Sequence, residues 1–198
     1  FNTPKPGMSR EASTLIAIQH LQSDLRAGFT TVRDMSTHGN GYGDVDIRDA
    51  INRGEIDGPR AQVSTLGIIW GGSENVAANN PLASAVVHNV DEARAAVRDQ
   101  VQHGADWIKV YADYRWGPNG QTMPTFSEVE LRAMVETARS SGRAVVAHSS
   151  TPEGMRRAIM AGVEDIEHGD GGTPEVFALM KEKGVAFCPT LAAGDATT

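Results

Sequence analysis

Hydrophobic and polar residues along this chain alternate between two spacings, one helical and one extended. In residues 9–26 the apolar side chains recur every three or four positions, which predicts a helix with one buried face that starts near Ser9. Residues 29–34 form a short β-branched run, which is typical of a strand. A polar loop then leads to a second helix that contains Ile47 and ends at Gly54. The chain is therefore expected to open with a helix, a strand and a helix.

The same unit of strand and helix recurs to the end of the chain. Strands are predicted at residues 61–69, 105–112, 143–148, 162–168 and 185–191, and helices at residues 90–102, 127–139, 152–160 and 174–183. With the first unit this gives six strands and six helices in alternation. Such alternation predicts parallel strands joined by right-handed crossovers.

These strands would form either an open sheet or a closed barrel. The sequence has no GxGxxG turn after a strand and no GxxxxGK[ST] loop, so a nucleotide-binding sheet is unsupported. A TIM-like (β/α)8 barrel fits the alternation, but it needs eight units and roughly 250 residues. The chain begins at Phe1 and ends in a loop-like stretch at Thr198. We therefore expect residues 1–198 to be a truncated α/β barrel that holds about strands two to seven and lacks the first and last.

Composition narrows the class of partner. The chain carries 18 Lys and Arg residues against 25 Asp and Glu, a formal net charge of −7, which argues against a nucleic-acid surface and against attraction to anionic lipid. No apolar run approaches the roughly 18 residues of a membrane-spanning helix. A single cysteine, Cys188, excludes an internal disulfide framework. We expect a small-molecule partner. The sequence leaves open whether the protein is a homo-oligomer and whether it is cytoplasmic, periplasmic or secreted.

Polar side chains occur in three successive predicted strands, near the carboxyl ends where the active site of an α/β barrel lies. Lys109 interrupts an apolar run, on the same face as Tyr111, and His148 and His168 end the next two strands. A buried ammonium needs a partner, so a salt bridge to a neighbouring strand is one interpretation of Lys109. Neutral imidazole is a common metal ligand. The histidines therefore indicate either a divalent-metal site suited to hydrolysis or two hydrogen-bonded structural residues.

Several segments together resemble one known family. They are residues 28–34 (GFTTVRD), 58–60 (GPR), 104–111 (GADWIKVY), 146–148 (VAH) and 161–169 (AGVEDIEHG). In order and approximate spacing they resemble the metal-dependent amidohydrolase superfamily, and within it the branch related to Xaa-Pro dipeptidases and imidazolonepropionases. The resemblance covers nearly the whole chain.

This resemblance implies a distorted barrel with a divalent-metal centre, often of two zinc ions. Lys109 matches the lysine that becomes a carbamate and bridges the two metals, and His148 and His168 match ligands of the second metal. The implied reaction is hydrolysis of a carbon–nitrogen bond in a small amide or dipeptide, by attack of a metal-bound hydroxide on the carbonyl. Tyr111 or Tyr114 would donate a hydrogen bond to the developing oxyanion, or would serve only in packing.

Three further residues are candidate contacts for the substrate. Residues 71–89 form a long predicted loop that contains Glu74, and loops of this length often cover a pocket. His38 follows the end of a predicted strand, and Tyr114 follows the strand that carries Lys109. We expect these side chains to line the pocket.

Two parts of the family pattern are absent from the sequence. It contains no His-x-His pair, which in the family holds the first metal, and no strand with the family's final metal-binding aspartate. Only three of the six usual metal-site residues are therefore present, and we expect this chain by itself to be inactive. The alternatives are a catalytically inactive barrel that binds small molecules or has a structural role, and a deaminase of the same superfamily.

Overall fold

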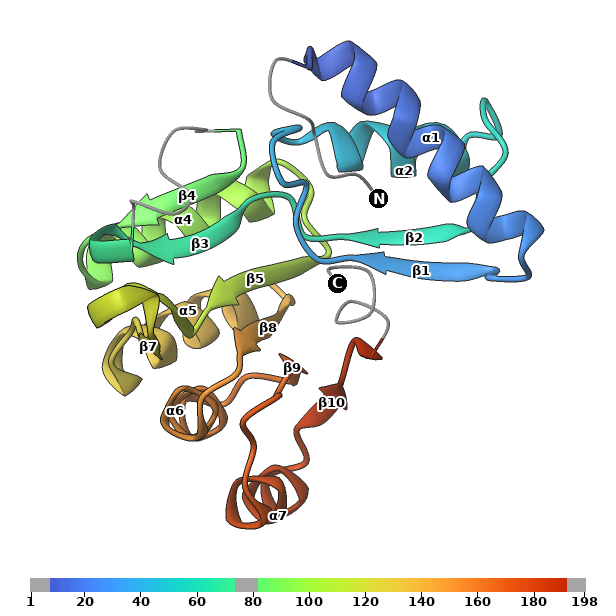
Figure 1. Cartoon of the computed structure of the whole chain (residues 1–198). Helices are drawn as coiled ribbons and strands as arrows, with labels where there is room; N and C mark the ends of the chain where they lie inside the picture. Colours follow the sequence, from blue (N-terminus) through green and yellow to red (C-terminus); the bar gives the residue numbers. More distant parts are fainter. Residues whose placement is uncertain (1–7, 74–81, 192–198) are drawn as a thin grey trace.

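The computed structural model describes residues 8–73 and 82–191, in which short strands and helices follow one another along the chain (Figure 1). Its helices and strands are, in chain order, α1 (Arg10–Arg26), β1 (Thr31–Asp34), α2 (Gly43–Asn52), β2 (Arg60–Val63), β3 (Gly67–Trp70), β4 (Ser84–Val87), α4 (Val90–Gln102), β5 (Trp107–Tyr111), β6 (Asp113–Arg115), β7 (Thr122–Pro124), α5 (Glu128–Ser140), β8 (Ala144–Ser149), α6 (Pro152–Ala161), β9 (Asp165–His168), α7 (Pro174–Lys183) and β10 (Ala186–Cys188). Two 3₁₀ turns cover Gly71–Ser73 and Pro118–Gly120.

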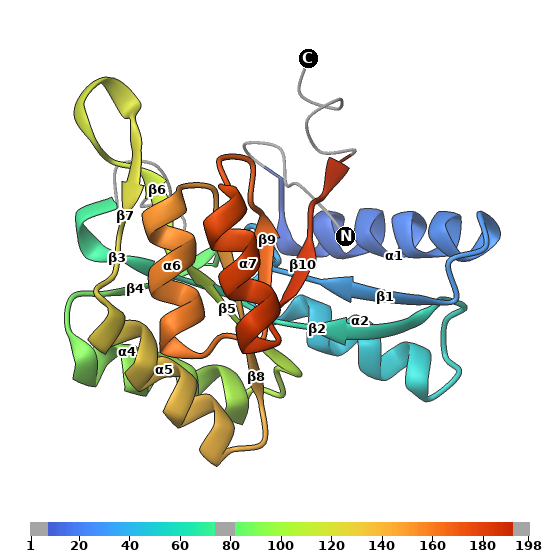
Figure 2. The same cartoon turned by 90° about the horizontal axis from the view of Figure 1, so that it is seen from below.

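The strands form one large parallel sheet and two smaller pairs. The main sheet has six strands in the order β10-β9-β8-β5-β3-β4, and β1 pairs in parallel with β2. Helices α4 to α7 follow one another along one side of the main sheet, and α1 and α2 lie beside β1 and β2 (Figures 1 and 2). Among the described helices, none is both long and apolar enough to cross a bilayer. The predicted parallel α/β architecture is confirmed.

Successive side chains of the central strands point alternately to the two faces of the main sheet, one of which is covered by helices. Ile108 and Val110 of β5 belong to the apolar core that also contains residues of α4, α5 and α6. Val145 and Ala147 of β8 belong to the same core. Because successive side chains in a strand point to opposite faces, Lys109 lies on the other side of the sheet.

The strand predicted at residues 61–69 is wrong in one respect, because two strands replace it. β2 ends at Val63 and β3 begins at Gly67, and the two belong to different sheets. Between them Thr65 has a left-handed backbone (φ +58°), and its N–H donates to the buried carboxylate of Asp44 at 2.8 Å. The Asp106 N–H donates to the Val63 carbonyl at 2.8 Å, so β2 still lies beside the start of β5. The chain therefore bends at Thr65, and the strands on both sides of the bend, β2 and β3, lie along the same edge of β5.

Strand β4 and the antiparallel hairpin of β6 and β7 were not predicted. Both consist of strands of three or four residues, which are too short to show a clear period. The hairpin is anchored by Trp116, whose indole N–H lies 3.0 Å from the Met123 carbonyl oxygen. The Trp116 ring also packs edge-on against Trp70 of β3 at 5.0 Å.

Capping residues explain where the helices begin and end. The side chain of Ser9 accepts a hydrogen bond from the N–H of Ala12, as expected for the predicted start of α1. The other helices with a side-chain cap at the amino end are α4, α5, α6 and α7, capped by Asn89, Ser127, Thr151 and Thr173. Helices α6 and α7 end at left-handed glycines, Gly162 and Gly184.

Gln100 of α4 generates a prediction about stability. It is fully buried, and neither its amide nitrogen nor its amide oxygen has a hydrogen-bond partner among the described residues. Because a buried, unpaired amide destabilises the folded state, Gln100→Met should raise the free energy of unfolding by about 1–2 kcal/mol. Chemical denaturation measures this change. The exposed neighbour Gln102 is the control, and a Gln100→Met protein less stable than the wild type would contradict the interpretation.

Asp44 of α2 generates a prediction about pH. Burial, and then the negative charge of Asp34, raise the pKa of Asp44 to about 7 in the folded state. Folding therefore favours its protonated form. The resulting stabilisation is complete below the unfolded pKa of about 4 and is lost as the pH rises through 7.

Asp44→Asn removes this titration, so the stability of the wild type relative to the variant should fall by up to about 4 kcal/mol between pH 4 and pH 8. Denaturation at a series of pH values measures the difference. Asp46→Asn, at an exposed position of the same helix, should follow the wild type throughout. A constant difference between wild type and Asp44→Asn would contradict the prediction.

Candidate functional site

Lys109 is buried in the middle of β5, with 2% of its surface exposed. Its ammonium donates a hydrogen bond to Glu167 Oε2 at 2.7 Å. Burial lowers the pKa of Lys109, and the negative charge of Glu167 opposes this effect. The structure thus contains a salt bridge of the kind that the sequence offered as one interpretation. The partner, however, belongs to β9, which β8 separates from β5.

A second cation, Arg33 of β1, joins the same cluster. It forms ion pairs with Asp165 and, at 3.4 Å, with Glu167. Its guanidinium carbon lies 4.7 Å from the centre of the Trp107 ring. Two cations and two carboxylates therefore neutralise one another inside the fold, and they connect β1 to β5 and β9.

The imidazole of His148 lies at the end of β8 among other rings. Its centre is 4.6 Å from the centre of His168, 4.9 Å from Tyr111 and 5.9 Å from Tyr114. Burial, and then the positive charge of Lys109, lower the pKa of His148 to about 2. The ring is therefore neutral near pH 7, which is the form that binds metals.

His168 reaches the same place through an unusual backbone conformation. Ile166 of β9 belongs to the helix-facing core, so alternation would put His168 on that side as well. His168 instead has a left-handed φ of +74°, and its ring lies against His148. Its Nδ1 is hydrogen-bonded to Thr190 Oγ1 at 2.7 Å. The structure thus brings together the two histidines that the sequence singled out.

The two candidate tyrosines occupy different positions. Tyr111 packs beside Lys109 and His148, with the ammonium 5.6 Å from its ring centre, and burial raises the pKa of Tyr111 to about 12. Tyr114 meets Tyr111 edge-on at 5.5 Å and lines an open pocket. A small molecule in this pocket would therefore contact Tyr114, with Tyr111 behind it.

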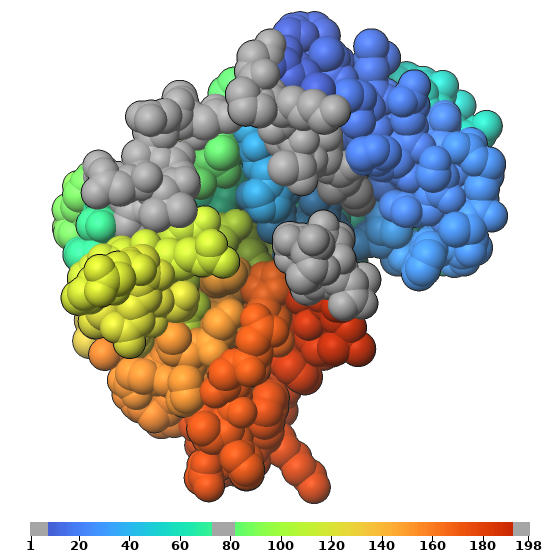
Figure 3. Space-filling view, in the orientation of Figure 1, coloured from blue at the N-terminus to red at the C-terminus, as the bar shows by residue number. Residues whose placement is uncertain are grey.

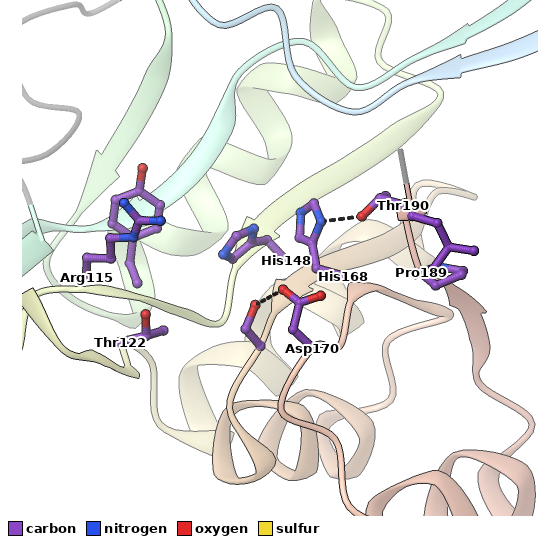
Figure 4. A pocket seen from close by; sticks show the side chains of 10 residues that line it. Arg115, Thr122, His148, His168, Asp170, Pro189 and Thr190 are labelled. Atoms are coloured by element: carbon purple, nitrogen blue, oxygen red, sulfur yellow. Dashed lines mark hydrogen bonds between the residues drawn. The ribbon is translucent and has the colours of Figure 1, made fainter. Parts of the chain in front are cut away.

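The pocket has a volume of about 660 Å³ and opens beside the two imidazoles (Figure 4). One wall is the β6–β7 hairpin, and the other consists of loops that follow β8, β9 and β10. The hairpin supplies Arg115 and Thr122, and the loops supply Ser150, Asp170 and Thr190. In the space-filling view the yellow-green hairpin lies directly beside the orange segment that contains α6 (Figure 3). A pocket of this size suits a small ligand.

The structure does not bring every predicted contact to this pocket. His38 lies in the loop after β1 with an exposed side chain, and it does not line the pocket. Glu74 lies outside the described residues, so its role stays a prediction. Arg115 and Thr122 were not predicted as pocket residues, because the hairpin that carries them was not predicted from the sequence. Asp170 lies two residues after the end of a predicted strand, and this position could have indicated that it lines the pocket.

Asp113 was also missed, although it determines the path of the chain after His148. It is fully buried at the start of β6. Its carboxylate accepts hydrogen bonds from the Ser149 hydroxyl at 2.8 Å, from the Ser150 N–H at 2.9 Å and from the Thr151 N–H at 2.7 Å. One buried carboxylate thus fixes the turn from β8 into α6, directly after the candidate metal ligand.

The donors present fit part of a divalent-metal site. His148 and His168 offer adjacent imidazoles, and burial also lowers the pKa of His168. Within the described residues, no group of three or more His, Cys, Asp or Glu side chains lies close enough to hold a metal ion. A metal bound here would therefore need further donors besides these two histidines.

Comparison with known proteins identifies the family. The model of the amidohydrolase family matches residues 8–198, so the chain belongs to the amidohydrolase family. It is 33% identical to ochratoxinase from Aspergillus niger over 190 residues, covering 84% of this chain and 38% of that protein. It is 37% identical to an uncharacterised protein from Mycobacterium tuberculosis over 112 residues, covering 56% of this chain and 30% of that protein.

Solved structures agree with this assignment. A Xaa-Pro dipeptidase with methionine bound in its active site has a TM-score of 0.85 and 33% identity, covering 98% of this chain and 51% of that chain. A prolidase complexed with N-methylphosphonate-L-proline has a TM-score of 0.80 and 29% identity, covering 93% of this chain and 48% of that chain. The predicted superfamily and its barrel-type α/β fold are confirmed. The chain spans about half the length of these structures.

Asp113 generates the prediction of this section. Asp113→Ala leaves the N–H groups of Ser150 and Thr151 without their charged acceptor in a partly buried turn, so the free energy of unfolding should fall by roughly 2–4 kcal/mol. Chemical denaturation measures the loss. Asp91→Ala is the control, since the Asp91 side chain is 95% exposed. A loss below about 0.5 kcal/mol, the usual range for exposed sites, would show that the carboxylate does not hold the turn.

Proposed function

We propose that the protein is a metal-dependent hydrolase that cleaves the carbon–nitrogen bond of an amide or peptide in a small substrate. The observation that carries the proposal is the gathering of Lys109, His148 and His168 from β5, β8 and β9 beside one pocket. The similar proteins include a dipeptidase, a prolidase and an ochratoxinase. The methionine and the proline phosphonate in two of those structures further favour small peptides as substrates.

His148 and His168 would hold a divalent metal through neutral nitrogen atoms, and Lys109, as a carbamate, would bridge two zinc ions. Carbamate formation joins the uncharged lysine nitrogen to the carbon of carbon dioxide with loss of one proton. Burial of Lys109 supports this role because it lowers the pKa of the lysine and so favours the uncharged amine. Bound divalent ions supply Lewis acidity, which activates water and polarises a carbonyl.

Tyr114 is the better candidate for a hydrogen bond to the substrate carbonyl oxygen. Its ring lines the pocket and lies 5.9 Å from the His148 ring, whereas Tyr111 lies behind it. The O–H of a phenol can donate to an oxygen as negative charge develops there. Tyr111 would then support Tyr114 by packing. Glu74 remains a candidate substrate contact, whereas His38 does not line this pocket.

The test is a Lys109→Ala variant of the whole protein. The wild type should hold about two divalent metal ions per chain and hydrolyse small dipeptides. The variant should lose most of the metal, and its turnover should fall at least about 100-fold. Elemental analysis and a dipeptide hydrolysis assay measure these effects. Lys181→Ala, at an exposed position of α7, is the control.

Because Lys109→Ala leaves Glu167 with only the more distant Arg33 as a cation, the double variant Lys109→Ala/Glu167→Gln tests the same role without an undercompensated buried carboxylate. Labelling with ¹³C-bicarbonate should give a carbamate signal in the wild type that both variants lack. Normal metal content and turnover in folded Lys109→Ala protein would contradict the proposal.

A further inference from the structure

Arg115 is a pocket residue to which the proposed reaction assigns no role. It lies at the end of β6 in the hairpin, and it lines the pocket together with Tyr114 and Thr122. In Figure 4 it stands on the opposite side of the imidazoles from Thr190. The side chain therefore reaches the space where a substrate would lie.

The charge of Arg115 has no partner within the described part of the chain. Most other arginines near the hairpin and the main sheet form close ion pairs, as Arg33, Arg48 and Arg157 do. No carboxylate of the described residues pairs with Arg115. Its charge does reach the site, because it is one of the causes that lower the pKa of His148. Burial and the charges of Lys109 and His168 have larger effects on that pKa.

The surroundings of Arg115 favour a carboxylate as the missing partner. Thr122 is directly opposite Arg115 in the hairpin register and also lines the pocket, so a hydroxyl donor lies beside the guanidinium. Tyr114 adds a phenol on the same wall. The acidic lining residue Asp170 is on the opposite wall, in the loop after β9 (Figure 4). An anionic group would therefore be attracted to the hairpin and repelled from the far side.

The hairpin holds Arg115 in place before any ligand binds. The indole of the next residue, Trp116, donates to backbone carbonyls of β7 and packs against Trp70. At the base of the hairpin the N–H of Thr125 donates to the Ala112 carbonyl at 3.0 Å. A guanidinium on a fixed strand loses less conformational freedom on binding than one on a mobile loop. Its planar fork also matches the two oxygens of a carboxylate.

From these observations we infer that Arg115 binds a free carboxylate of the substrate, so that the preferred substrates are amides of amino acids with an unblocked carboxyl end. This inference rests on the proposed function, and it names the class of substrate. With the carboxylate at the hairpin, the neighbouring amide bond lies toward His148 and His168. Arg115 is thus a residue that determines specificity and does not take part in the chemical step.

A binding experiment tests Arg115 independently of hydrolysis. The probes are the N-methylsulfonyl derivatives of proline and methionine, each as the free acid and as the carboxamide, since the sulfonyl group takes the place of the acyl carbonyl that the reaction would attack. Calorimetry on the metal-loaded whole protein measures their affinities. The wild type should bind each acid about 10- to 100-fold more tightly than its carboxamide, as expected for a charged hydrogen-bonded pair.

Arg115→Met should reduce this preference to about one, and Arg115→Lys should retain part of it because the charge remains. Arg98→Met, which removes an exposed arginine of α4, should bind as the wild type does. A wild type without acid preference, or an Arg115→Met protein that keeps it, would overturn the inference and show Arg115 to be a solvated surface residue. Tighter binding of inorganic phosphate than of either acid would also overturn it, in favour of a phosphate site.

Hydrolysis of dipeptides is measured separately on the same wild-type protein. If the acid preference is present without hydrolysis, the proposed function fails and the role of Arg115 stands. If hydrolysis occurs without the acid preference, the role of Arg115 fails and the proposed function stands.

Discussion

The balance of charge around the buried side chains of Lys109 and Glu167 is the constraint on which the rest of the structure depends. An unpaired ammonium in the middle of a buried strand would destabilise the fold severely, and so would an unpaired carboxylate. Arg33 and Asp165 complete a cluster of zero net charge, so that no charge is left uncompensated. Because the members come from β5 and β9 of the main sheet and from β1 of the separate β1–β2 pair, the cluster also requires the main sheet to curve and the β1–β2 pair to lie against it.

The curvature of the main sheet brings the candidate site residues close together. The helix-facing residues of β5 and β8 pack into a conventional apolar core, and the opposite faces converge on Lys109 and His148. Asp113 adds a second buried carboxylate, which binds the turn after β8 and so fixes the direction in which His148 points. The hairpin then closes one side of the pocket. A different interaction stabilises each part of the site. Ion pairs stabilise the buried cluster, hydrogen bonds to Asp113 stabilise the turn after β8, and aromatic packing stabilises the hairpin.

Local signals in the sequence were sufficient for the parallel α/β architecture and for the residues of the strand ends. Helix α7 was predicted with its observed bounds, because its stop signal, Gly184, and its cap, Thr173, are adjacent to it in the sequence. The break between β2 and β3 was not predicted, because it depends on Asp44, a residue twenty-one positions from Thr65. The hairpin was missed for a similar reason, since it depends on packing between Trp116 and Trp70, which lie far apart in the chain.

The left-handed backbone of His168 has a consequence for the way this chain could change. Glycine adopts this conformation most readily, and among the residues with a side chain asparagine, aspartate and histidine adopt it more often than the others. Backbone conformation alone would therefore favour glycine at this position, whereas the imidazole contributes its hydrogen bond to Thr190 and its packing against His148. Position 168 is thus a point where the backbone and the side chain make different demands: glycine would fit the backbone with the least strain, but it would remove the imidazole and its contacts.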